Sequence, residues 1–109
     1  MDVRLPAHLE VSSLSRQVEA EGGFATVIKK GEREAGTILI VLTESGKNGR
    51  LYERMPQLDG SRSWHCSMRQ DTEKLDEFEK YLERRANQDP DVWILELDIR
   101  DGERFVGQF

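Results

Sequence analysis

Gly36-Thr-Ile-Leu-Ile-Val-Leu-Thr43 is the most apolar segment of the chain, and the fold depends on its conformation. Its core, from Ile38 to Leu42, is apolar at every position, rich in β-branched residues and bracketed by Gly36 and Gly46. A short run of this kind favours a strand over a buried helix. Because it does not alternate, we expect it to be covered on both faces, or to lie centrally with one face on a core and the other partly shielded.

Further strands are predicted on either side of this run. Turn residues separate them: Ser45-Gly-Lys-Asn-Gly49 before the next strand, and Pro56 with Leu58-Asp-Gly60 before the one after. The late segment Val92-Trp-Ile-Leu-Glu-Leu-Asp-Ile99 alternates after its start, which is typical of a half-exposed antiparallel strand. The predicted strands span residues 24–28, 37–43, 50–55, 62–68 and 92–99.

Two amphipathic helices are predicted, over residues 6–21 and 71–87. In the first, Leu14 and Val18, with Leu9 and Val11 more loosely, recur at three- and four-residue steps, and Gly22-Gly23 ends the helix. In the second, Asp71-Thr72 supplies the N-cap and Pro90 the stop. Its polar side pairs Asp76 with Lys80, and its apolar stripe comprises Leu75, Phe78, Tyr81, Leu82 and Ala86.

These elements predict an α+β fold in the order α-β-β-β-β-α-β. We expect a single domain over residues 1–109, with a twisted antiparallel sheet of about five strands and both helices packed on one face. The position of the last strand in the sheet stays open. Asp101-Gly102 indicates a hairpin, after which residues 104–109 pair briefly or fray.

Strand parity predicts which side chains face the core. In the fourth strand, one face carries Trp64, Cys66 and Met68, which we expect to be buried, and the other carries Ser63, His65 and Ser67. In the last strand, Glu96 and Asp98 point outward, and the inward set is Trp93, Leu95, Leu97 and Ile99.

Charge and cysteine content narrow the possible partners and location. The net charge of −5 and the absence of a basic run argue against nucleic-acid binding. With Cys66 as the only cysteine, no intramolecular disulfide forms, and a reducing compartment is favoured. Without an apolar leader or a run of about 18 apolar residues, we expect no membrane association and a cytoplasmic location.

Several short blocks resemble a known family. They are Arg4-Leu-Pro-Ala, Gly22-Gly-Phe-Ala, Ala35-Gly-Thr-Ile-Leu, Leu51-Tyr-Glu-Arg, Gln88-Asp-Pro-Asp-Val-Trp and Glu96-Leu-Asp, in order over essentially the whole chain. Together they resemble an alphaproteobacterial domain of unknown function, number 1491 in the DUF series. The resemblance implies a small, single-domain bacterial cytoplasmic protein, and it implies no activity, cofactor or catalytic residue.

No metal centre, cofactor site or catalytic constellation is predicted. The only histidines and cysteine are His8, His65 and Cys66, and strand neighbours point to opposite faces, so His65 and Cys66 cannot serve one ion or one reaction. Cys66 is better explained as a small buried hydrophobe. The loop Gly46-Lys-Asn-Gly49 does not open a helix and therefore lacks the geometry of a phosphate-binding loop.

One polar constellation stands out as a candidate ligand-binding site. Arg50, Tyr52 and Arg54 line one face of the third strand, Arg62 lies across the turn, and Glu53 falls on the face expected to be core. Together they could bind an anionic ligand, and an enclosed Glu53 could act as an acid or base. Alternatively, the arginine stripe is a solvated face with cross-strand pairs, and Glu53 is solvated or pairs with an arginine on a neighbouring strand.

The sequence therefore favours a non-enzymatic protein-binding or adaptor domain that meets another protein through a sheet face or edge. Self-association through a sheet edge is possible. The alternatives are a small enzyme or anionic-ligand binder using Glu53 with Arg50, Tyr52 and Arg54, and, more weakly, an RNA-binding sheet built on Tyr52 and the two arginines.

Overall fold

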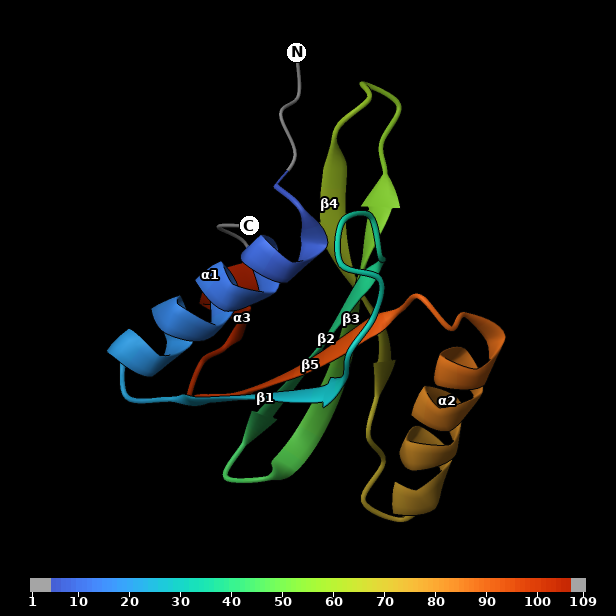
Figure 1. Ribbon diagram of the computed structural model, residues 1–109. Helices are drawn as coiled ribbons and strands as arrows, with labels where there is room; N and C mark the ends of the chain where they lie inside the picture. The colour runs from blue at the N-terminus through green and yellow to red at the C-terminus, as the bar shows by residue number, and fades with distance from the viewer. Residues whose placement is uncertain (1–4, 107–109) are drawn as a thin grey trace.

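The computed structural model describes residues 5–106 (Figure 1). A helix, four strands, a helix and a strand follow one another, which confirms the predicted element order, and a short helix comes last. Within these residues, no helix has the length and apolar character needed to cross a bilayer. The elements are α1 Ala7–Ala20, β1 Phe24–Lys29, β2 Ile38–Glu44, β3 Lys47–Pro56, β4 Arg62–Arg69, α2 Leu75–Gln88, β5 Trp93–Asp98 and α3 Glu103–Val106.

The five strands form one sheet in the order β1-β5-β2-β3-β4. β5 pairs antiparallel with β1 and parallel with β2, whereas the β2–β3 and β3–β4 pairs are antiparallel. The sheet is thus mixed, and the prediction of a purely antiparallel sheet was wrong at the β2–β5 pair. Because α2 returns the chain to the end at which β4 began, β5 runs in the direction of β4 and hence of β2.

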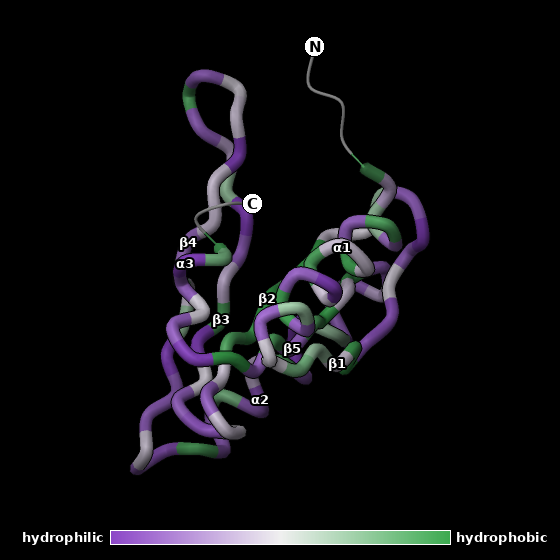
Figure 2. The backbone as a smooth tube through the Cα atoms, turned by 90° about the vertical axis from the view of Figure 1, so that its left-hand side faces the viewer, coloured by the Kyte–Doolittle hydropathy of each residue, from purple (hydrophilic) through white to green (hydrophobic). Residues whose placement is uncertain are grey.

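The two long helices cover opposite faces of the sheet, so the prediction that both pack on one face was wrong. Ile38, Ile40 and Leu42 of β2 belong to the core under α1. Leu39 and Val41 belong to the core under α2. Figures 1 and 2 show β2 and β5 between the two helices. The unbroken apolar run of β2 demands this arrangement, because side chains on both faces of the strand need cover.

The β2–β3 hairpin turns on two residues with positive φ, Ser45 at 54° and Gly46 at 75°. This is the backbone of a tight hairpin whose twist matches that of its strands. The Asp98 carboxylate, on the neighbouring β5, accepts hydrogen bonds from the Ser45 and Gly46 backbone N–H groups, each at 2.8 Å. β3 therefore starts at Lys47, earlier than the predicted residue 50, and β5 holds the turn in place.

A β-bulge in β4 changes the predicted faces of that strand. Leu51 pairs with Met68 and Tyr52 pairs with Cys66, so Ser67 is the extra residue. Trp64 and Cys66 pack against the α1-side core as predicted, whereas Met68 packs against the α2-side core. A bulge reverses the parity of all residues beyond it, which alternation alone does not predict.

The predicted apolar stripes of the helices are only partly confirmed. Val11, Leu14 and Val18 of α1 are buried, but Leu9 is 47% exposed. In α2, Phe78 and Leu82 are buried, Tyr81 and Ala86 are partly buried, and Leu75 is exposed. The helix begins at Leu75 rather than at Asp71, whose carboxylate instead accepts a hydrogen bond from the Glu73 N–H at 2.9 Å in the preceding turn. The predicted Asp76–Lys80 ion pair forms at 3.3 Å.

The chain after β5 forms the short helix α3, so the predicted hairpin at Asp101-Gly102 was wrong. Asp101 does adopt a positive φ of 55°, but the chain then coils from Glu103. Phe105 and Val106 are buried in the α1-side core. Burial of these two side chains explains why this segment covers the sheet instead of extending it. Residues 107–109 of the predicted pairing lie outside the described part of the chain.

The loop between β1 and β2 folds over Trp93. The indole Nε1 donates a hydrogen bond to the Glu32 carbonyl oxygen at 2.7 Å, and the Glu32 N–H donates to the Asp91 carbonyl oxygen at 2.9 Å. The same loop receives the start of α1, because the Ala7 N–H donates to the Glu34 carbonyl oxygen at 2.9 Å. These contacts satisfy an otherwise unpaired helix N-terminus.

We expect Gly31→Ala to lower the free energy of unfolding by about 2 kcal/mol, because the loop has no room for a side chain. A Cβ at this position would lie 2.6 Å from the Val92 carbonyl carbon and 2.7 Å from Trp93 Cδ1. Urea denaturation followed by tryptophan fluorescence measures the loss. The exposed neighbour provides the control: Lys30→Ala should stay within about 0.5 kcal/mol of wild type. Equal effects of the two substitutions would contradict the close packing.

Candidate functional site

Arg50, the first residue of the predicted ligand-binding site, is buried and fully engaged within the fold. Its side chain is 1% exposed. The guanidinium binds the Glu103 carboxylate of α3 in a bidentate manner, with Nε–Oε2 at 2.6 Å and Nη2–Oε1 at 3.0 Å. Nη1 donates to the Asn48 carbonyl oxygen at 2.7 Å. Arg50 thus ties α3 to the sheet.

Tyr52 and Arg54 continue the same stripe, and both contact other elements. The Tyr52 hydroxyl lies 3.4 Å from Glu103 Oε2, and burial, together with the Glu103 charge, raises the pKa of Tyr52. Arg54 forms a bidentate pair with the Glu10 carboxylate of α1, with Nη2–Oε2 at 3.0 Å. Its guanidinium carbon also lies 4.7 Å from the centre of the Trp64 ring. Arg54 therefore holds α1 against the sheet.

Glu53 lies on the opposite face of β3, under α2. Its carboxylate pairs with the Arg85 guanidinium of that helix, and the two side chains are 15% and 25% exposed. Although burial lowers the pKa of Arg85, its hydrogen bonds with Glu53 and Tyr81 raise that pKa overall. The arginine partner of Glu53 comes from a helix rather than from a neighbouring strand, because α2 covers this face.

The five predicted ligand-binding residues are therefore not brought together. Arg50, Tyr52 and Arg54 share the α1 face, Glu53 faces α2, and Arg62 stands opposite Pro56 where β4 begins. Three carboxylates, those of Glu103, Glu10 and Glu53, each neutralise one guanidinium within the fold. This arrangement joins α1, α2 and α3 to the sheet.

Histidine and cysteine side chains are also separated. His65 stands opposite Glu53 in the β3–β4 ladder and faces α2, while Cys66 packs against the α1-side core, as strand parity predicts. The His65 Nε2 atom lies 3.1 Å from Ser63 Oγ and 3.3 Å from Gln57 Nε2. Over residues 5–106, no group of three or more His, Cys, Asp or Glu side chains converges as a metal site would require.

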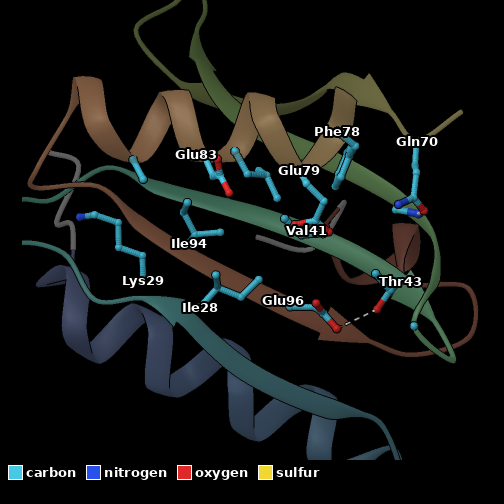
Figure 3. A pocket seen from close by; sticks show the side chains of 14 residues that line it. Ile28, Lys29, Val41, Thr43, Gln70, Phe78, Glu79, Glu83, Ile94 and Glu96 are labelled. Carbon is cyan, nitrogen blue, oxygen red and sulfur yellow. Dashed lines mark hydrogen bonds between the residues drawn. The ribbon is translucent and has the colours of Figure 1, made fainter. Parts of the chain in front are cut away.

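The candidate functional site is instead a cleft between α2 and β1, which we call the α2–β1 cleft. It has a volume of about 360 Å³. Val41 and Ile94 form its floor, and Ile28 of β1 forms one wall. The opposite wall belongs to α2 (Figure 3), and the Val41 and Ile94 side chains of the floor are each only 2% exposed. The α2 residues that line it are Phe78, Glu79, Leu82, Glu83 and Ala86.

Polar side chains are placed asymmetrically in the cleft. Glu96 rises from the floor beside Thr43, whose hydroxyl donates to Glu96 Oε2 at 3.3 Å, and Glu79 and Glu83 point toward them from α2 (Figure 3). Lys29 stands at the other end, where its ammonium donates to the Pro90 and Val92 carbonyl oxygens at 2.7 and 2.9 Å. The lining thus carries three glutamates against one lysine.

Sequence reasoning did not identify this cleft. Alternation correctly places Glu96 on the outward side of the last strand, but the prediction of both helices on the other face leaves that side without cover. Ile28 lies at a bulge between Val27 and Lys29, which turns it toward the cleft. The unbroken apolar run of β2 was the available signal, since it indicated two covered faces.

Comparisons with known proteins agree on one family. The model of the family described as "Protein of unknown function (DUF1491)" matches residues 5–107. No curated protein matches the chain. A crystal structure of a DUF1491 family protein from Caulobacter crescentus CB15 is 36% identical, with a TM-score of 0.79 and 94% of each chain covered.

Two solution structures are also similar. The NMR structure of a DUF1491 family protein from Caulobacter crescentus CB15 is 34% identical, with a TM-score of 0.79, and the match covers 96% of this chain and 94% of that one. Protein Atu0922 from A. tumefaciens is 30% identical, with a TM-score of 0.71, and the match covers 91% and 89% of the two chains. The chain therefore belongs to the DUF1491 family.

Proposed function

We propose that this protein is a non-enzymatic protein-binding domain that meets its partner through the α2–β1 cleft. The observation that supports this most directly is the exposed apolar side chain in the wall of the cleft. Ile28 is 49% exposed there, whereas Val41 and Ile94 in the floor are each 2% exposed. An apolar surface edged by charged side chains is typical of a protein interaction site.

The sheet face is a better contact surface than a sheet edge. β1 and β4 are the two edge strands of the described sheet, and each is interrupted by a bulge, between Val27 and Lys29 in β1 and at Ser67 in β4. Bulges twist an edge away from regular pairing and are a common protection against edge-to-edge association. Self-association through an edge is correspondingly disfavoured.

The contacts of the arginine stripe argue against the two alternative functions. An anionic ligand at Arg50 or Arg54 would have to displace the bidentate carboxylate of Glu103 or Glu10. An RNA base needs an exposed ring to stack on, and Tyr52 is only 8% exposed. We propose a cytoplasmic location on the ground that the chain has a single cysteine, as reducing compartments favour.

Affinity capture from cells that express the protein natively tests the proposal. Ile28→Glu places a charge in the cleft wall and should remove the specific partner from the eluate. Leu58→Glu introduces the same side chain at the fully exposed tip of the β3–β4 hairpin and should leave the partner bound. Both positions are exposed, so each variant should stay within about 0.5 kcal/mol of wild-type stability. A partner lost with Leu58→Glu but kept with Ile28→Glu would refute the cleft as the contact surface.

A further inference from the structure

From the charge distribution in the α2–β1 cleft we propose its occupant: a short extended segment of a partner protein that presents lysine or arginine beside apolar side chains. This inference rests on the proposed function and specifies the chemistry of the partner. Its basis is Glu96, which is half-buried in the floor of the cleft.

Glu96 has no cation of its own within the described chain. It lies on β5 between Thr26 of β1 and Val41 of β2, and neither neighbour carries a charge. The only hydrogen bond to its carboxylate within residues 5–106 comes from the Thr43 hydroxyl, and no lysine or arginine of that range forms an ion pair with it. Other buried or half-buried charges on the sheet are better satisfied: Glu53 and Arg50 have ionic partners, and the Asp98 carboxylate accepts two backbone N–H hydrogen bonds.

The rest of the cleft also favours a positive ligand. Glu79 and Glu83 have no ion-pair partner among residues 5–106, and they point toward Glu96 from the facing helix (Figure 3). Lys29 does not neutralise them, because its ammonium is held by the Pro90 and Val92 carbonyl oxygens at the far end. The net charge of −5 adds long-range attraction for a basic partner.

The dimensions select an extended segment. The lining of α2 runs from Phe78 to Ala86, which corresponds to about 12 Å along the helix axis. About four residues of extended chain cover that length, and their alternate side chains point the same way. Cationic side chains on one face of the segment would reach Glu96 in the floor, and apolar side chains on its other face would lie against the exposed Ile28 of the wall.

Fluorescence anisotropy with labelled hexapeptides tests this assignment on the intact protein. Three probes are compared. RLRLRL carries cationic and apolar side chains, RSRSRS keeps only the cationic ones, and SLSLSL keeps only the apolar ones. We expect RLRLRL to bind saturably at submillimolar concentration and at least tenfold more tightly than either other peptide. Glu96→Gln should weaken its binding about tenfold, as for the loss of a charge-assisted hydrogen bond.

Glu77→Gln is the matched control, because Glu77 is an exposed residue of α2 outside the cleft lining and carries the same charge. This variant should bind RLRLRL as wild type does. Circular dichroism and thermal unfolding establish that each variant is folded. Amide chemical shifts should change at Ile28, Thr43, Ile94 and Glu96 on addition of the peptide.

Three results would overturn the inference: no saturable binding of RLRLRL, equal losses with Glu96→Gln and Glu77→Gln, or shift changes that fall outside the cleft. If SLSLSL binds in the cleft as tightly as RLRLRL, the preference for a cation is refuted while protein binding at this site stands. If the natural partner survives Ile28→Glu in the capture experiment, the proposed function fails whatever the peptides do.

Discussion

Replacing Glu103 with alanine is expected to lower the free energy of unfolding by about 3 kcal/mol, because it leaves the buried Arg50 guanidinium without its bidentate partner. Arg50 is 1% exposed, so water cannot replace the lost carboxylate. The guanidinium would keep two weaker partners, the Asn48 carbonyl oxygen at 2.7 Å from Nη1 and the Glu44 carboxylate at 3.8 Å from Nη2. The measurement is urea denaturation at neutral pH, followed by circular dichroism.

A double-mutant cycle separates this penalty from a simple loss of packing. Arg50→Met removes the buried charge, so Glu103→Ala should cost much less in that background than in wild type. Strictly additive losses would show that the pair is not coupled. A loss below about 1 kcal/mol for Glu103→Ala alone would show that the Arg50 guanidinium is not buried as described.

The same pair makes stability depend on pH in one direction. Burial would raise the pKa of Glu103, but the hydrogen bonds and charge of Arg50 lower it below its ordinary value of 4.5. A carboxyl whose pKa is lower in the folded state stabilises the fold above its unfolded pKa, and loses this effect as pH falls through the folded pKa. The stability difference between wild type and Glu103→Gln should therefore be constant near neutral pH and shrink below about pH 4.5.

Leu95→Ala is expected to lower the free energy of unfolding by about 3–4 kcal/mol, as for a fully buried leucine whose removal leaves a cavity that its neighbours do not fill. Leu95 is 1% exposed on β5, between Ile40 of β2 and Val27 of β1. Chemical denaturation, monitored by the fluorescence of Trp64 and Trp93, measures the loss. Leu58→Ala makes the same truncation at a fully exposed position and should be neutral within about 0.5 kcal/mol.

The outcome of this experiment also tests whether the sheet makes its two cores one cooperative unit. Leu95 contributes to the core under α1, whereas Phe78 and Leu82 of α2 belong to the other core. Since β2 and β5 contribute to both, fluorescence and helical circular dichroism should lose signal at the same urea concentration. Separate transitions in Leu95→Ala would show that α2 can stay docked when the α1 side has melted.

The elements of this fold were predictable from sequence because each has a strong local signal. The apolar run of residues 38–42, the Gly22-Gly23 helix end and the alternation in β5 all act over a few residues. The predictions that were wrong concern contacts between segments that are distant in the sequence. The position of β5 between β1 and β2, and the placement of α2 opposite α1, follow from which surfaces remain uncovered after the whole chain has collapsed.

The candidate site was harder to predict for a related reason. The stripe of Arg50, Tyr52 and Arg54 was visible in the sequence, but the partners of its arginines come from α1 and α3, 44 and 53 residues away. Without those partners, a structural ion pair and a ligand site have the same local pattern. The α2–β1 cleft likewise combines residues of β1, β2, β5 and α2, and the bulge at Ile28 gives no recognisable signal in the sequence.

The strand order also constrains when the protein can acquire its shape during synthesis. β1 and β2 follow one another along the chain, yet the segment Trp93–Asp98 lies between them. Until that last strand has left the ribosome, β1 has no hydrogen-bonding neighbour and β2 lacks one of its two. Unpaired strands of this kind expose hydrogen-bonding edges to other chains, so the interval before Trp93–Asp98 emerges is the one in which aggregation competes with folding.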